Sequence, residues 1–151
     1  MGSEPADSGV EGVMIDPDAP PPGRPTDWRA LAAVGIGGAL GAPARYGIAT
    51  LVDITPGTYP WGTFWINVSG SFALGFLLAV LLERLRRVPR YLRPLLATGF
   101  LGAYTTYSTF AVETDLLVKN GHWPVAMAYV ASSFAVGLLA AALGLRLGRP
   151  R

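Results

Sequence analysis

The 151-residue chain has no cysteine, a single histidine and few charged residues, which make up 15% of the total. The absence of cysteine excludes disulfides, thiolate nucleophiles and thiolate metal sites. The histidine, His122, lies in the polar stretch 119–122 and is interpreted as a solvated loop residue. Because no nucleophile–base pair and no cluster of metal-binding side chains stands out, the sequence does not predict an enzyme.

The scarce charges leave long stretches of the chain without any. Between Ala30 and Leu82 the only charges are Arg45 and Asp53, and residues 94–112 and 123–145 carry none. Such runs approach the roughly 20 apolar residues that cross a bilayer as a helix. A chain of this length cannot enclose so much apolar surface in its own interior. The composition therefore predicts a membrane protein.

The N-terminal part differs from the rest. Residues 1–27 carry three consecutive prolines, little apolar content and six acidic residues: Glu4, Asp7, Glu11, Asp16, Asp18 and Asp27. This composition predicts a disordered tail. The tail has no basic stretch followed by an apolar core, so it is not expected to be a signal peptide. We therefore predict two parts, an acidic, proline-rich tail over 1–27 and a membrane domain over 28–151.

Four apolar segments within the membrane domain are long enough to cross the bilayer. They run over about 28–52, 61–82, 92–117 and 124–147. The short connections predict a compact antiparallel bundle, so the fold class is an all-α membrane protein with four transmembrane helices.

The basic residues predict how this bundle is oriented. With four crossings, ten arginines fall on one side of the membrane, and only Lys119 falls on the other. The ten are Arg24, Arg29, Arg84, Arg86, Arg87, Arg90, Arg93, Arg146, Arg149 and Arg151. Because cytoplasmic loops carry the excess of positive charge, both termini are expected in the cytoplasm, with the chain in the inner cell membrane.

The third segment contains residues that are unfavourable in a helix facing lipid. Residues 99–110 read GFLGAYTTYSTF, with two glycines and several hydroxyl side chains. Glycine weakens a helix and hydroxyls can bond to backbone carbonyls, which predicts a helix broken near 102–105, close to the bilayer midplane. Carbonyls freed there need a partner, and a desolvated cation is one solution. The alternative is an intact helix whose small residues permit close packing.

Two polar stripes at helical spacing lie in the neighbouring segments. Asn67 and Ser71 share one helix face, and Tyr129 and Ser133 share another. Stripes of this kind can mean interhelical packing alone. Beside a hydroxyl-rich break they favour a pathway for an anion, whose donors would be Asn67, Thr106, Ser108, Thr109 and Ser133. The positive ring edges of Tyr107 and Phe110 suit an anion, and no acidic ring that would select cations lies within the spans.

Apart from Arg29 at its start, Arg45 is the only charged residue in the first segment, where an unpaired charge is costly. Glu113 lies at a similar level in the third segment. We expect Arg45 either to pair with Glu113 or to line an anion vestibule; a snorkelling anchor is the alternative.

Three stretches together resemble the Fluc/CrcB family of fluoride channels. They are GGALGAPARY at 37–46, GTFWINVSGSF at 62–72, and the sequence at 99–110, in which TTYSTF is the most specific part. The resemblance covers about residues 33–147.

This resemblance implies an inverted dimer of antiparallel subunits, with two narrow pores that export fluoride passively and relieve its toxicity. It also implies one structural, non-transported Na⁺ at the dimer centre. By motif, the main-chain carbonyls of Gly102 and Thr105 would hold the Na⁺. The ion pathway would be formed by Asn67, Tyr107, Phe110, Tyr129 and Ser133.

Two features depart from the family pattern. Tyr107 stands where the family usually has phenylalanine. The arginine bias is heavier than insertion in both orientations would suggest. We therefore hypothesise that the chain inserts in one orientation and pairs with an oppositely oriented paralogue rather than with itself.

Two rival functions remain at this point. A small multidrug exporter has the same size and helix number, but it needs a glutamate in the first helix, where this chain has Arg45. A non-transporting assembly subunit would use the polar stripes for packing only.

Overall fold

A computed structural model describes residues 26–52, 55–81 and 89–149. Most of the predicted tail over 1–27 lies outside these residues, as do Arg24, Arg84, Arg86, Arg87 and Arg151.

The described residues are helical and contain no strand, so the predicted all-α class is confirmed. The helices are α1 (Trp28–Thr50), α2 (Trp61–Ala79), the π-helix η2 (Pro94–Leu101), α3 (Gly102–Tyr104), α4 (Tyr107–Lys119) and α5 (Trp123–Gly148). α1, α2 and α5 fall on three of the predicted segments, and the third segment is divided into η2, α3 and α4.

Local interactions explain where the first helix begins. Asp27 caps α1, because its Oδ1 accepts a hydrogen bond of 3.2 Å from the backbone N–H of Ala30. The same carboxylate lies 2.8 Å from the guanidinium of Arg90. This ion pair ties the start of α1 to the segment that leads into η2.

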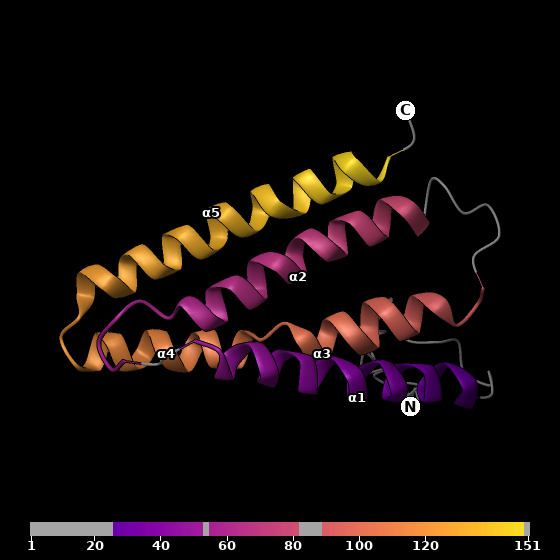
Figure 1. The fold of residues 1–151 in the computed structure, drawn as a ribbon, viewed down its shortest axis with the longest axis horizontal. Coiled ribbons are helices and arrows are strands. Elements are labelled where there is room, and N and C mark those ends of the chain that lie inside the picture. The colour runs from indigo at the N-terminus through magenta and orange to yellow at the C-terminus, as the bar shows by residue number, and fades with distance from the viewer. Residues whose placement is uncertain (1–25, 53–54, 82–88, 150–151) are drawn as a thin grey trace, which may run out of the picture.

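The helices form two closely packed pairs, visible as two layers in Figure 1: α5 lies along α2, and α1 lies along η2 and α3. Glycines make both contacts close. A Cβ atom at Gly41 would meet the carbonyl of Phe100 in η2, and one at Gly144 would meet the carbonyl of Phe72 in α2. Small residues that let backbones approach in this way are typical of helix pairs in membranes.

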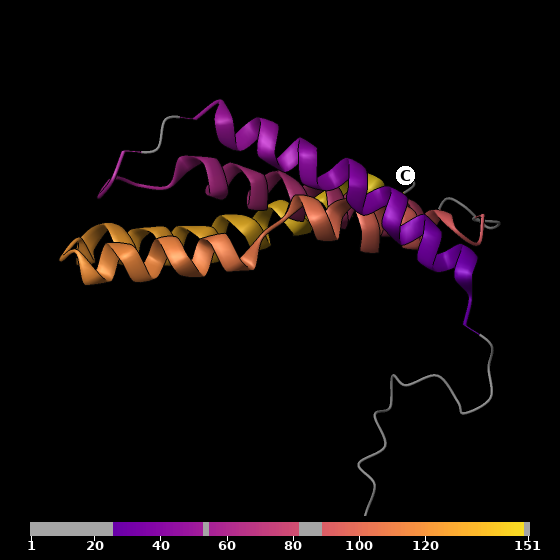
Figure 2. The same cartoon turned by 90° about the horizontal axis from the view of Figure 1, so that it is seen from below.

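Two extended residues interrupt the third segment. α3 ends at Tyr104, Thr105 has φ −76° and ψ 158°, Thr106 has φ −146° and ψ 123°, and α4 begins at Tyr107. The interruption carries the chain from one packing partner to another, since η2 and α3 lie against α1 whereas α4 lies beside α5 (Figure 2). The sequence placed the interruption at 102–105, and the extended residues are 105 and 106.

Large apolar side chains cover the outside of the bundle. The exposed fraction is 70% for Leu138, 60% for Phe134 and 58% for Val112. α2 and α5 are long and apolar enough to cross a membrane, judged by length and composition. An apolar exterior of this extent indicates contact with lipid or with another chain.

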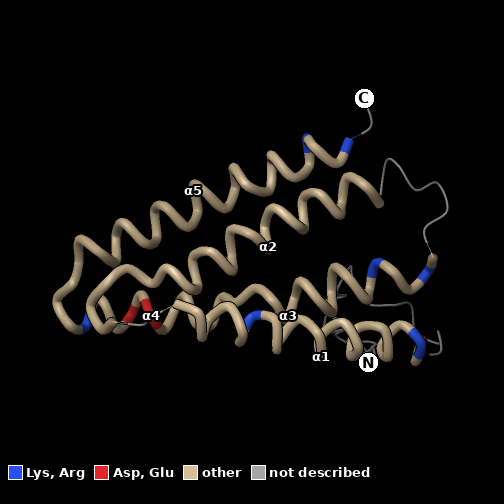
Figure 3. The backbone as a smooth tube through the Cα atoms, viewed as in Figure 1, with Lys and Arg blue, Asp and Glu red and all other residues tan. Residues whose placement is uncertain are grey.

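The charged residues lie mainly at the two ends of the bundle. Arg29, Arg146 and Arg149 belong to the end where α1 starts and α5 finishes, whereas Asp115 and Lys119 form an ion pair of 2.7 Å at the opposite end (Figure 3).

Candidate functional site

The side chain of Asn67 in α2 holds the interruption of the third segment. Its Nδ2 donates a hydrogen bond of 3.0 Å to the carbonyl of Thr106, and its Oδ1 accepts one of 2.9 Å from the N–H of Thr106. The carboxamide thus bonds to both backbone groups of one extended residue, as a neighbouring strand would. Asn67 therefore joins α2 to the interruption.

Thr106 in turn caps α4. Its Oγ1 accepts a hydrogen bond of 3.2 Å from the N–H of Thr109 and donates one of 3.0 Å to the Oγ1 of the same residue. The hydroxyl of Ser108 lies 3.3 Å away. Three of the hydroxyl groups predicted from the sequence are therefore brought together at the start of α4.

These bonds leave two backbone carbonyls without the donors that a continuous helix would supply. In an α-helix the N–H of residue i bonds to the carbonyl of residue i−4. The N–H of Thr106, which would bond to Gly102, goes to Asn67, and the N–H of Thr109, which would bond to Thr105, goes to the Thr106 hydroxyl. The carbonyls of Gly102 and Thr105 are hard oxygen ligands, so they fit a cation such as Na⁺.

A cavity of about 360 Å³ lies beside the interruption. It lies between α2, α4 and α5, and its polar lining includes Asn67, Ser71, Thr105, Thr106, Tyr107 and Ser133. Both predicted polar stripes contribute residues to this one cavity. The Oγ of Ser133 is buried and has no hydrogen-bond partner in the described part of the chain, so it can bond to an ion or molecule bound in the cavity.

Aromatic rings border the same cavity. The ring centroid of Phe110 lies 5.0 Å from that of Tyr129, 6.1 Å from that of Phe134 and 6.2 Å from that of Tyr107. Phe110 is therefore the centre of this aromatic group, whereas Tyr107 lies at its edge with 78% of its surface exposed.

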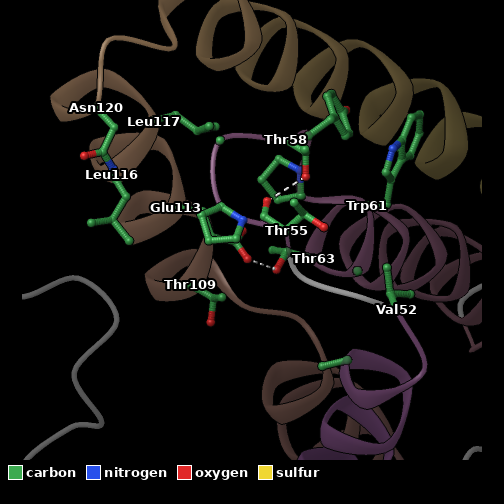
Figure 4. Close-up of a pocket in the computed structure, with 16 residues that line it drawn as sticks. Val52, Thr55, Thr58, Trp61, Thr63, Thr109, Glu113, Leu116, Leu117 and Asn120 are labelled. Atoms are coloured by element: carbon green, nitrogen blue, oxygen red, sulfur yellow. Dashed lines mark hydrogen bonds between the residues drawn. The ribbon is translucent and has the colours of Figure 1, made fainter.

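A second cavity, of about 260 Å³, lies under the loop 55–60 at the other end of α4. Glu113 lines it and accepts a hydrogen bond of 2.8 Å from the hydroxyl of Thr63 (Figure 4). It accepts a second hydrogen bond, also of 2.8 Å, from the hydroxyl of Tyr129. The ring of Tyr129 is fully buried. Glu113 thus connects α4 to both α2 and α5.

The hydrogen-bond partners of Glu113, Thr63 and Tyr129, were not predicted from the sequence. Thr63 precedes Asn67 by four residues and so continues the α2 stripe, which was the available signal. The expected pairing with Arg45 is not found, because the two Glu113 oxygens accept from Thr63 and Tyr129, and no ion pair joins Glu113 to Arg45 in the described part of the chain. The alternative, that Arg45 lines a vestibule, stays a prediction.

Removal of the Tyr129 hydroxyl should destabilise the bundle. Tyr129→Phe takes one hydrogen-bond partner from the half-buried carboxyl group of Glu113, a loss that costs about 1–3 kcal/mol. We expect a lower midpoint in thermal unfolding of the detergent-solubilised protein. Tyr46→Phe is the matched control, because Tyr46 is 72% exposed. Equal midpoints for the two variants would show that the Tyr129–Glu113 bond does not stabilise the bundle.

Comparison with known proteins gives a consistent set of matches. The family described as CrcB-like protein, Camphor Resistance (CrcB), matches residues 32–145. A protein named fluoride-specific ion channel FluC 1 from Mycobacterium bovis is 48% identical over 123 residues, which cover 82% of this chain and 92% of that protein. FluC 1 from Mycolicibacterium paratuberculosis is 46% identical over the same coverage, and a FluC from Magnetococcus marinus is 45% identical over 79% of this chain and 97% of that protein.

Proposed function

Because the chain belongs to the CrcB-like family, which confirms the resemblance seen in its sequence, we propose that it is a fluoride-specific ion channel of the cell membrane. It exports fluoride passively and so lowers the cytoplasmic concentration of a toxic anion. The small multidrug exporter is not favoured, because the relatives are named fluoride channels and α1 carries no acidic residue.

The cavity beside the interruption is the observation that carries this function. Fluoride is small and tightly hydrated, so a channel must replace its water with several donors at once. The cavity offers the buried hydroxyl of Ser133, the carboxamide of Asn67 and the ring of Phe110, and no charged side chain lines it. An anion in it would meet donors and positive ring edges without a carboxylate to repel it.

The proposed cation site explains why an anion channel would contain an interrupted helix. In an inverted dimer the two-fold axis lies in the membrane plane, so the interruptions of two subunits would meet near the midplane. The carbonyls of Gly102 and Thr105 from each subunit would then surround one Na⁺. The bound Na⁺ would supply fixed positive charge and compensate carbonyls that lack helical donors.

The topology of this proposal is four crossings with both termini in the cytoplasm, and it can be tested directly because the chain has no cysteine. We expect Asn120→Cys, beyond α4, to react with a membrane-impermeant maleimide in intact cells. Thr26→Cys, before α1, should react only after permeabilisation. Both positions are exposed in the structure, so labelling of Thr26→Cys in intact cells would overturn the assigned orientation.

The strong arginine bias supports one fixed orientation and therefore a paralogue as the dimer partner. In that case the chain expressed and purified alone should give no fluoride efflux from liposomes, since half of the dimer is missing. Efflux from liposomes that contain this chain alone would instead establish pairing with a second copy.

The function itself is best tested in the native host, where any partner is present. Deletion of the gene should raise cytoplasmic fluoride and slow growth in millimolar fluoride, with no effect in equal chloride. The wild-type gene should restore growth. Unchanged fluoride accumulation in the deletion strain, in a host without a second exporter gene, would contradict the proposal.

A further inference from the structure

The oxygen and the nitrogen of the Asn67 carboxamide bond to different backbone groups of Thr106. Oδ1 accepts the N–H of Thr106, the group that an uninterrupted helix would direct to the carbonyl of Gly102. Nδ2 donates one of its two protons to the carbonyl of Thr106, which leaves the second for the cavities that Asn67 lines.

We propose that Asn67 is a positioning residue for the cation site: its Oδ1 keeps the N–H of Thr106 away from the carbonyl of Gly102 and so leaves that carbonyl free to bind Na⁺. This inference rests on the proposed function. It adds that one residue serves both ions, with its oxygen acting on the cation site through the backbone and its amide nitrogen available to fluoride.

The surroundings of Asn67 support this role. The residue lies between the large cavity beside α4 and a smaller one of about 230 Å³ that is lined by Gly102 and Thr105. One side of Asn67 thus borders the space next to the cation-binding backbone, and the other borders the proposed fluoride pathway. No side chain other than Asn67 bonds to the backbone N–H of Thr106 within the described residues.

The two atoms can be separated by substitution. Asn67→Asp keeps an oxygen that accepts from Thr106 but removes the N–H donors and introduces a charge that repels fluoride. Asn67→Leu keeps the number of side-chain heavy atoms and the branching at Cγ, and it removes both functions. Ser71→Ala is the matched control, because Ser71 lies one turn further along α2 and lines both cavities but bonds to neither Thr105 nor Thr106.

The experiment uses the complex isolated from its own membranes and measures thermal unfolding against Na⁺ concentration, with choline as the replacement cation. The readout is the Na⁺ concentration that gives half of the maximal stabilisation, which a merely destabilised bundle would not change. We expect the wild type and Ser71→Ala to agree within about twofold. Asn67→Asp should need no more Na⁺ than the wild type, because its oxygen still accepts from Thr106 and its charge attracts a cation. Asn67→Leu should need about 10- to 100-fold more Na⁺, the usual loss when the support of a metal ligand is removed.

Fluoride efflux measured in parallel separates the two proposals. Asn67→Asp should lose fluoride efflux while its Na⁺ response persists. A wild-type Na⁺ response in Asn67→Leu would overturn the inference, and so would a lost Na⁺ response in Asn67→Asp. If Asn67→Leu does not fold, the Na⁺ response of Asn67→Asp alone decides the test. A wild-type complex that responds to Na⁺ but passes no fluoride would instead overturn the proposed function.

Discussion

Gly41→Ala is expected to destabilise the bundle by about 3 kcal/mol, the upper part of the range for overpacking, although it adds a single methyl group. The added Cβ would meet the backbone carbonyl of Phe100, and a backbone atom cannot turn away as the end of a side chain can. α1 and η2 would have to separate, and with them the contact that holds the first half of the third segment in place.

Gly35→Ala should instead stabilise the bundle. It lies in the same helix, but apart from neighbouring atoms of that helix no atom of the described residues lies within 4 Å of a Cβ built there. Alanine in a helix interior gains up to about 1 kcal/mol over glycine. Thermal unfolding of both variants, together with the fraction that stays monodisperse in detergent, measures the difference. Equal midpoints for the two variants would show that α1 and η2 are not packed as described.

Phe110→Leu is expected to reduce fluoride efflux by about 10- to 100-fold with little change in folding. The ring of Phe110 is central to the aromatic group at the cavity, and leucine offers no positive ring edge to an anion. A lost contact of about 1.5–3 kcal/mol to a charged group corresponds to that range of rates.

Tyr107→Phe is the matched control for this prediction. It keeps the ring and removes only a hydroxyl from a residue that lies at the exposed edge of the group. Fluoride efflux should stay within about twofold of the wild type. An equal loss of fluoride efflux in both variants, or unchanged fluoride efflux in Phe110→Leu, would mean that these rings do not contact the ion in the way proposed.

The extent of the helices was predictable from the sequence, because charge and proline mark their ends. The predicted spans 28–52 and 124–147 correspond to α1 (Trp28–Thr50) and α5 (Trp123–Gly148). The interruption was also signalled, since glycine and hydroxyl residues accumulate at one point of an apolar run. The π-helical winding of η2, which packs against α1, had no recognisable signal in the sequence.

The partners across helices were not predictable. Periodicity places Asn67 and Ser71 on one face of α2, but it does not say what that face meets. The bonds from Asn67 to Thr106, and from Thr63 and Tyr129 to Glu113, depend on the rotation and axial offset of packed helices. The same limit explains the mistaken expectation that Arg45 pairs with Glu113, which rested only on similar depth in the membrane.

The most direct measurement is ion efflux from liposomes reconstituted with the complex purified from its own membranes, recorded with a fluoride electrode and, separately, a chloride electrode. We predict rapid fluoride release and chloride release no faster than from protein-free liposomes. Fluoride release at the protein-free rate, or chloride release as fast as fluoride release, would contradict the assignment of this chain as a fluoride channel.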